Sequence, residues 1–152
     1  MAYWRLAYHI VWATKERLPL IAPEIEMPVY RALAHKCEEL DAVLFAVNGM
    51  PDHVHVVAAV KPTLALSEFV KQLKGSSSRF VHLEYELPFQ WQRGYGIFSI
   101  SDKLISTAVD YVRHQKQHHA AGSDIPAYER IESADLGPER TARFPTPYLG
   151  EG

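Results

Sequence analysis

Hydrophobic and polar positions alternate in blocks that predict strands and helices along most of the chain. Short runs rich in β-branched and aromatic residues are typical of strands, and hydrophobic residues three or four positions apart are typical of amphipathic helices. The expected strands are residues 4–13, 42–47, 53–60 and 95–100. The expected helices are residues 24–40, 66–80 and 102–118.

Two breaks separate these elements most clearly. Asn48-Gly49, followed by Met50-Pro51-Asp52, is a turn signal that would join the second and third strands as a hairpin. Gly75 and the serines at 76–78 interrupt the second helix, because glycine and serine are poor residues for a helix interior.

The order β-α-β-β-α-β-α predicts an α+β fold with a ferredoxin-like βαββαβ core and an additional C-terminal helix. The strands would form an antiparallel sheet with helices on one face. The open face, or its junction with the last helix, would hold the site. Beyond Gly122 the chain is rich in proline, glycine and charge, so we expect one domain over 1–122 and a mostly irregular tail over 123–152.

Composition is that of a globular protein, with 47% hydrophobic and 22% charged residues among 152. The single cysteine, Cys37, excludes an internal disulfide framework and a cysteine zinc cluster. No apolar run approaches the roughly 20 residues of a membrane span, and the N-terminal residues lack the pattern of a secretory signal. We therefore expect a cytoplasmic protein with no membrane partner.

The formal net charge of −2 does not by itself favour a nucleic-acid ligand, but the charge is unevenly distributed. Residues 120–152 are acidic, whereas the stretch from Lys61 to Arg79 is locally basic. This stretch is either a solvated helix face or a set of phosphate contacts. It lacks the glycine and lysine spacing of a P-loop, so its serines are better explained as a phosphate contact or a helix end than as nucleophiles.

The pair His53 and His55 is the first candidate for chemistry. Alternate residues of a strand share a face, so both imidazoles would point the same way. Such a pair can bind a divalent metal and leave positions open for substrate oxygens. It can equally be two histidines on a polar strand face.

Tyr111 and Gln115 form the second candidate, since residues four apart lie on one helix face. A tyrosine hydroxyl with its ordinary pKa of about 10 is a poor nucleophile without a cation or metal nearby. A glutamine oxygen one turn away can complete the shell of a hard metal. The alternative is a tyrosine at the edge of the core.

The block Asn48-Gly49-Met50-Pro51-Asp52-His53-Val54-His55-Val56 resembles the His-hydrophobic-His, or HUH, motif of the single-tyrosine transposases. These include small insertion-sequence transposases and REP-associated tyrosine transposases. Residues 8–15 are similar to the first strand of the family, and residues 69–80 to the helix after the histidines. Residues 91–101 and Tyr111-Val112-x-x-Gln115 are similar to the strand and helix of the nucleophile. The resemblance covers about residues 6–119.

The resemblance implies roles for these residues. Tyr111 would be the nucleophile, and His53, His55 and Gln115 would bind Mg²⁺ or Mn²⁺. The reaction would cut single-stranded DNA beside a hairpin, form a 5′-phosphotyrosine and rejoin strands, in the cytoplasm at the nucleoid. Insertion-sequence members act as dimers and REP-associated relatives can be monomers; a homodimer is expected here. Candidate DNA-backbone contacts are Lys71, Lys74, Arg79, Arg93 and Arg113.

Two other functions are consistent with the same residues. A ferredoxin-like sheet can bind nucleic acid through exposed aromatic residues without catalysis. The histidines can also hold a metal that activates water in a phosphodiesterase, which would leave no protein–DNA adduct. Asp52 would orient a histidine or shape the turn before it.

Overall fold

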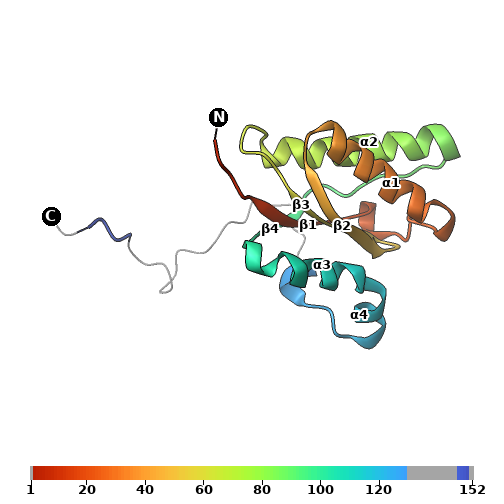
Figure 1. The fold of residues 1–152 in the computed structure, drawn as a ribbon. Helices are drawn as coiled ribbons and strands as arrows, with labels where there is room; N and C mark the ends of the chain where they lie inside the picture. Colours follow the sequence, from red (N-terminus) through yellow and green to blue (C-terminus); the bar gives the residue numbers. More distant parts are fainter. Residues whose placement is uncertain (1, 130–146, 151–152) are drawn as a thin grey trace.

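The computed structural model describes residues 2–129 and 147–150, and its hydrophobic blocks form a four-stranded sheet with helices on both faces (Figure 1). The strands are β1 (Ala7–Ala13), β2 (Val43–Met50), β3 (His53–Ala59) and β4 (Gly96–Ile100). The helices are α1 (Pro23–Glu39), α2 (Leu66–Tyr85), α3 (Ile105–Arg113) and α4 (Gln115–Ala121). Short 3-10 turns lie at Lys15–Arg17, Asp102–Leu104 and Pro126–Glu129.

The sheet has the order β2-β3-β1-β4, and each neighbouring pair is antiparallel. This is the topology of a ferredoxin-like core, so the predicted α+β fold class is confirmed. Helices α1 and α2 lie on one face, and α3 packs against β2 and β3 from the other face (Figure 1). Within the described residues, none of the helices is long and apolar enough to cross a bilayer.

Strand β3 is buried on both of its faces because it lies between β1 and β2 under both helix layers. Val54, Val56 and Ala58 belong to the main hydrophobic core with α1 and α2. His53 and His55 alternate with them, so they point to the opposite face, where Val57 packs with residues of α3. The two histidines therefore project from the most enclosed strand of the sheet.

The hairpin turn differs from the prediction. Strand β2 continues through Asn48 and Gly49 as far as Met50, and the turn is formed by Pro51 and Asp52. Gly49 has no unusual φ; its role is to allow close approach, because a Cβ at this position would lie 2.2 Å from the backbone oxygen of His53. The Asn-Gly pair thus marks a close approach of the paired strands β2 and β3, not the turn itself.

The predicted interruption of the second helix is also wrong, because α2 is continuous through Gly75 and the serines. Ser77 is buried; its hydroxyl donates to the carbonyl of Leu73 at 2.7 Å and accepts the indole N–H of Trp91 at 2.9 Å. Ser76 and Ser78 also bond to carbonyls within the helix. These serines are accommodated by bonds to the preceding turn, so they mark no helix end.

The last predicted helix is divided at His114, whose φ of −104° and ψ of 25° depart from helical values. The imidazole Nδ1 of His114 lies 2.7 Å from the carbonyl of Asp110, the same carbonyl that the backbone N–H of His114 reaches at 3.2 Å. The side chain and the backbone of His114 thus share one carbonyl acceptor at the point where the helix is interrupted. Tyr111 therefore lies on α3, and Gln115 begins α4, in place of one continuous helix.

The predicted irregular tail falls partly outside the described residues, at 130–146 and 151–152. Residues 123–129, called the C-terminal segment below, end in the turn Pro126–Glu129. They pack back onto the α3 face of the sheet, where Glu129 contacts His55.

Candidate active site

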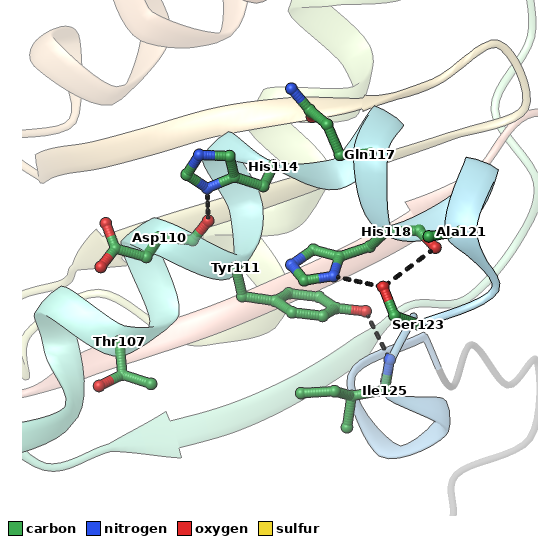
Figure 2. Close-up of a pocket in the computed structure, with 9 residues that line it drawn as sticks. All are labelled: Thr107, Asp110, Tyr111, His114, Gln117, His118, Ala121, Ser123 and Ile125. Atoms are coloured by element: carbon green, nitrogen blue, oxygen red, sulfur yellow. Dashed lines mark hydrogen bonds between the residues drawn. The ribbon is translucent and has the colours of Figure 1, made fainter.

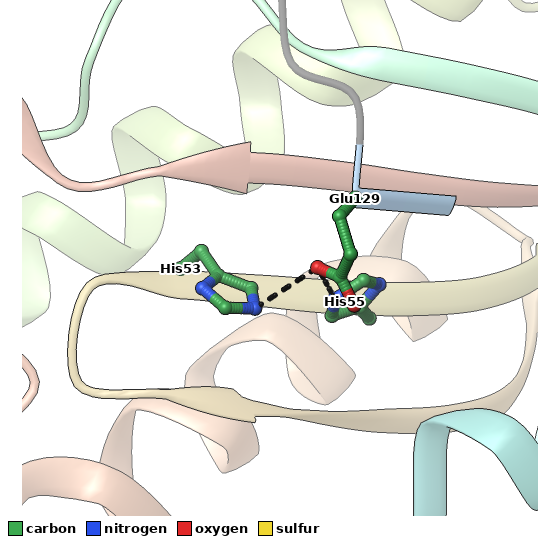
Figure 3. Close-up of side chains that lie close together, drawn as sticks. All are labelled: His53, His55 and Glu129. Atoms are coloured by element: carbon green, nitrogen blue, oxygen red, sulfur yellow. Dashed lines mark hydrogen bonds and ion pairs between the residues drawn. The ribbon is translucent and has the colours of Figure 1, made fainter. Parts of the chain in front are cut away.

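His53 and His55 direct the same ring nitrogen toward one oxygen atom (Figure 3). The Nε2 atoms of His53 and His55 lie 3.2 Å and 2.9 Å from Oε2 of Glu129. Both imidazoles are completely buried, and their ring centroids are 5.1 Å apart. The structure thus confirms that alternate positions of this strand present both histidines on one face.

The other nitrogen of each histidine has its own partner. Nδ1 of His53 lies 2.8 Å from Oδ1 of Asp52, and Nδ1 of His55 lies 2.7 Å from Nε2 of His9. Arg17 in turn donates to Asp52 at 3.3 Å. Partners of this kind hold the orientation of a histidine ring and the nitrogen that it presents to a ligand. Asp52 therefore has both of its anticipated roles, since it lies in the turn and also contacts His53.

His9 is a site residue that the sequence did not reveal. It lies on β1 and is buried, and burial lowers its pKa to about 3, so its ring is neutral near pH 7. Because side chains alternate along a strand, His9 points to the opposite face of β1 from the core residues Ile10 and Trp12. Only the pairing of β1 with β3 brings this face beside His55. Strand alternation predicts which face of β1 carries His9, but it does not predict that His55 lies beside it.

Tyr111 lies beside this histidine pair in the same chain, with its ring centroid 6.1 Å from that of His55. Its hydroxyl donates to Oε1 of Glu129 at 2.7 Å and accepts the backbone N–H of Ile125 at 2.8 Å. The ring stacks on His118, with centroids 4.7 Å apart, at a cavity of about 560 Å³ (Figure 2). Burial, together with the bond to Glu129, raises the pKa of Tyr111 to about 12.

Glu129 is the second residue that the sequence did not reveal, because it lies in the tail and belongs to no motif. Its carboxylate contacts His53, His55 and Tyr111, and Oε1 lies 3.4 Å from Nε2 of His119. Burial opposes its ionisation, but the bonds from His53 and His55 outweigh burial and hold its pKa well below the ordinary value. The carboxylate is therefore ionised at neutral pH.

These donors fit a divalent metal. One atom each from His53, His55 and Glu129 lies within 4.8 Å of the others. For metal–ligand bonds of about 2.1 Å, adjacent ligands of an octahedral ion are about 3.0 Å apart. The two nitrogen–oxygen distances to Glu129, 2.9 and 3.2 Å, are hydrogen-bond distances and are compatible with that spacing. Two imidazoles and one carboxylate are also a common ligand set for a metal with open positions.

Gln115 lies next to this centre, where its side chain interacts with both Tyr111 and His119. It is fully buried at the start of α4, and its Oε1 lies 3.2 Å from Nε2 of His119. His119 in turn packs against His53, with ring centroids 4.9 Å apart. The structure thus brings Tyr111, Gln115 and both histidines to one region, with His119 between the amide and the carboxylate.

The predicted DNA contacts are spread over the molecule. Lys71, Lys74 and Arg79 lie on α2, across the sheet from Tyr111, and Arg113 lies on α3 (Figure 1). Lys71, Arg79, Arg93 and Arg113 are exposed. Lys74 is different: its ammonium donates to the carbonyls of Gln92 and Gly94 at 2.8 and 2.7 Å, and burial lowers its pKa to about 8. It holds the loop before β4 in place.

The sequence matches the family described as "Transposase IS200 like" over residues 2–115. It is similar to the transposase for insertion sequence element IS200 of Salmonella typhimurium, with 28% identity over 129 residues that cover 80% of this chain and 84% of the relative. It is also similar to the ISDra2 transposase TnpA of Deinococcus radiodurans, with 26% identity over 119 residues that cover 74% and 85%.

The fold resembles two solved structures. A protein of Deinococcus radiodurans described as a transposase aligns with a TM-score of 0.62 and 25% identity, covering 81% of this chain and 95% of that one. A REP-associated tyrosine transposase bound to a REP hairpin aligns with a TM-score of 0.57 and 17% identity, covering 82% and 76%. The family match ends at Gln115, so Glu129 lies outside it.

Proposed function

This chain belongs to the IS200-like family of HUH single-tyrosine transposases, and from that premise we propose that it cleaves and rejoins single-stranded DNA beside a hairpin through a 5′-phosphotyrosine. One observation carries the proposal. The hydroxyl of Tyr111 and the Nε2 atoms of His53 and His55 contact the two oxygens of a single carboxylate. The nucleophile and the histidine pair therefore face the same position, which is large enough for an anionic group such as a carboxylate.

In the proposed reaction Oη of Tyr111 forms a bond to the phosphorus of the scissile phosphodiester. The bond from phosphorus to the 3′ oxygen breaks, which leaves a 5′-phosphotyrosine and a 3′-hydroxyl. The proton lost by Tyr111 is balanced by the proton gained by the 3′ oxygen. Rejoining is the reverse, with a 3′-hydroxyl displacing the tyrosine, so neither water nor a nucleotide is consumed.

Tyr111 needs help in this role, because a buried phenol with a raised pKa is a weak nucleophile. His53 and His55 would hold Mg²⁺ or Mn²⁺, with Gln115 as the third protein ligand in the DNA-bound enzyme. A divalent cation there supplies positive charge to the non-bridging oxygens of the phosphate. Helix α3 contributes position, since Tyr111 projects from it toward the histidines.

A hairpin substrate is supported by the fold, because a structural neighbour is a tyrosine transposase bound to a REP hairpin. Exposed Lys71, Arg79, Arg93 and Arg113 would contact phosphates, on both faces of the sheet. Lys74 would have to release two carbonyls to do so. We also propose a homodimer, which light scattering of the purified protein tests.

The test is a denaturing gel of end-labelled single-stranded DNA containing the hairpin that flanks the gene. With Mn²⁺ or Mg²⁺ we expect a band shifted by one protein mass, and no such band in EDTA. Tyr111→Phe should reduce the adduct at least 100-fold, because the phenyl ring keeps its packing but has no nucleophilic oxygen.

Tyr95→Phe is the matched control, since Tyr95 packs against the main core on the other side of the sheet. It should form the adduct normally. Cleavage that persists in Tyr111→Phe without any adduct would contradict the proposal and indicate hydrolysis by activated water.

A further inference from the structure

Glu129 occupies the place that the proposed reaction needs for the substrate. Its Oε1 is 2.7 Å from the hydroxyl of Tyr111, and its Oε2 is within 3.2 Å of both histidines. A reacting phosphorus must come within about 3 to 3.5 Å of the attacking oxygen. The carboxylate and a scissile phosphate therefore cannot both be present there.

The rest of the C-terminal segment also engages the nucleophile. The backbone N–H of Ile125 donates to the hydroxyl of Tyr111 at 2.8 Å (Figure 2). Ser123 bonds to the side chain of His118, which stacks on the tyrosine ring. Tyr111 is only 5% exposed, and its oxygen already has a donor from this segment and an acceptor in Glu129. DNA reaches this oxygen only if the segment moves.

We infer that Glu129 is a metal ligand of the DNA-free enzyme, together with His53 and His55, and that the scissile phosphate displaces it. This inference rests on the proposed function of the histidine pair. Its geometric basis is the convergence of one donor atom each from His53, His55 and Glu129 to within 4.8 Å of one another. Its chemical basis is that a carboxylate and a phosphodiester are both anionic oxygen donors to the same kind of ion.

The inference concerns this chain in particular. Glu129 lies beyond the residues matched by the family, and it comes from a 3-10 turn separated by 18 residues from Tyr111 and 74 residues from His55. Of the two carboxylates in the C-terminal segment, Glu129 contacts the site, whereas Asp124 has no described contact with either histidine. Asp124→Asn is therefore a matched control for removing one negative charge from this segment.

The first experiment measures Mn²⁺ affinity of the full chain without DNA, from the electron paramagnetic resonance signal of free Mn²⁺. Glu129→Gln keeps the size of the side chain but removes the anionic ligand, so we expect at least tenfold weaker binding. Asp124→Asn should bind as the unmodified protein does. Circular dichroism of each variant shows that it is folded.

His55→Ala separates this inference from the proposed function. If His55→Ala abolishes Mn²⁺ binding and Glu129→Gln does not weaken it, Glu129 is no ligand and only the present inference is overturned. If His55→Ala leaves Mn²⁺ binding unchanged, the metal centre of the proposed function is itself wrong. The result for Tyr111→Phe in the cleavage assay bears on neither comparison.

The second experiment tests displacement in EDTA, where no metal contributes. The probe is a fluorescent single-stranded hairpin oligonucleotide, and the measurement is anisotropy. We expect Glu129→Gln to bind it several-fold more tightly than the unmodified protein, because a carboxylate no longer competes for the phosphate position. Equal or weaker binding, with Asp124→Asn unchanged, would show that DNA does not displace Glu129.

Discussion

At the scale of single residues, the hydrogen bond between His9 and His55 decides which nitrogen of His55 faces the candidate metal. With a metal bound in place of the hydrogen bond from His55 to Glu129, a neutral His9 can accept the Nδ1 proton of His55, which leaves the Nε2 lone pair of His55 for the metal. The HUH residues themselves were predictable, because strand alternation alone places them on one face. His9 and Glu129 were not, since their proximity depends on strand pairing and on the path of the tail.

We expect His9→Phe to weaken Mn²⁺ binding by about 10- to 100-fold, because the ring still fills the space but accepts no proton from His55. His9→Gln, which keeps an acceptor, should recover part of the loss. Isothermal titration with Mn²⁺ measures both. His35→Phe, at an exposed position on α1, is the control and should bind normally. Equal weakening by His9→Phe and His9→Gln would indicate a packing role only.

At the scale of elements, the β2–β3 hairpin positions the histidines, and its sequence signal was misleading. Asn48-Gly49 resembles a turn, yet both residues pair within the sheet with His55 and Val54. The helices and strands were otherwise predictable to within a few residues from periodicity. The break at His114 was not, because it depends on a side chain sharing a backbone acceptor.

Two glycine substitutions distinguish close packing from open space. Gly49→Ala should lower the free energy of unfolding by about 1–3 kcal/mol, because its methyl group would meet the backbone of His53 and Val54. Gly75→Ala should raise that free energy by about 0.5–1 kcal/mol, because its methyl group meets nothing within 4 Å and alanine favours the helix. Urea denaturation measures both. A stable Gly49→Ala protein would show that the two strands can separate.

At the scale of the whole molecule, Glu129 links the C-terminal segment to the central strand β3 through its contacts with His53 and His55. Its pKa is depressed in the folded state relative to an ordinary value of 4.5. A carboxyl group of this kind stabilises the fold above its unfolded pKa, and that contribution is lost as the pH falls through the folded value. Acid therefore weakens the interaction between the C-terminal segment and the sheet.

We expect the stability difference between the unmodified protein and Glu129→Gln, measured by urea denaturation in EDTA, to be fully present above about pH 5. It should shrink steadily as the pH falls below about 4.5, because the unfolded chain then takes up a proton at Glu129 that the folded protein does not. Glu84→Gln, which alters an exposed carboxylate of α2, is the control for removing one carboxylate outside the site. A constant difference for Glu129→Gln down to acidic pH would contradict the assigned contacts.

The short connection between Tyr111 and the C-terminal segment has a consequence for which nucleic acids can enter. A group tethered by a short chain has an effective concentration on the order of millimolar at its own binding place. A free phosphate or a dinucleotide that binds no more tightly than the carboxylate must exceed that concentration to displace Glu129. A folded hairpin that binds basic side chains at several points gains its own local concentration advantage. If Glu129 must be displaced as inferred, the segment would favour long, anchored substrates over small phosphates.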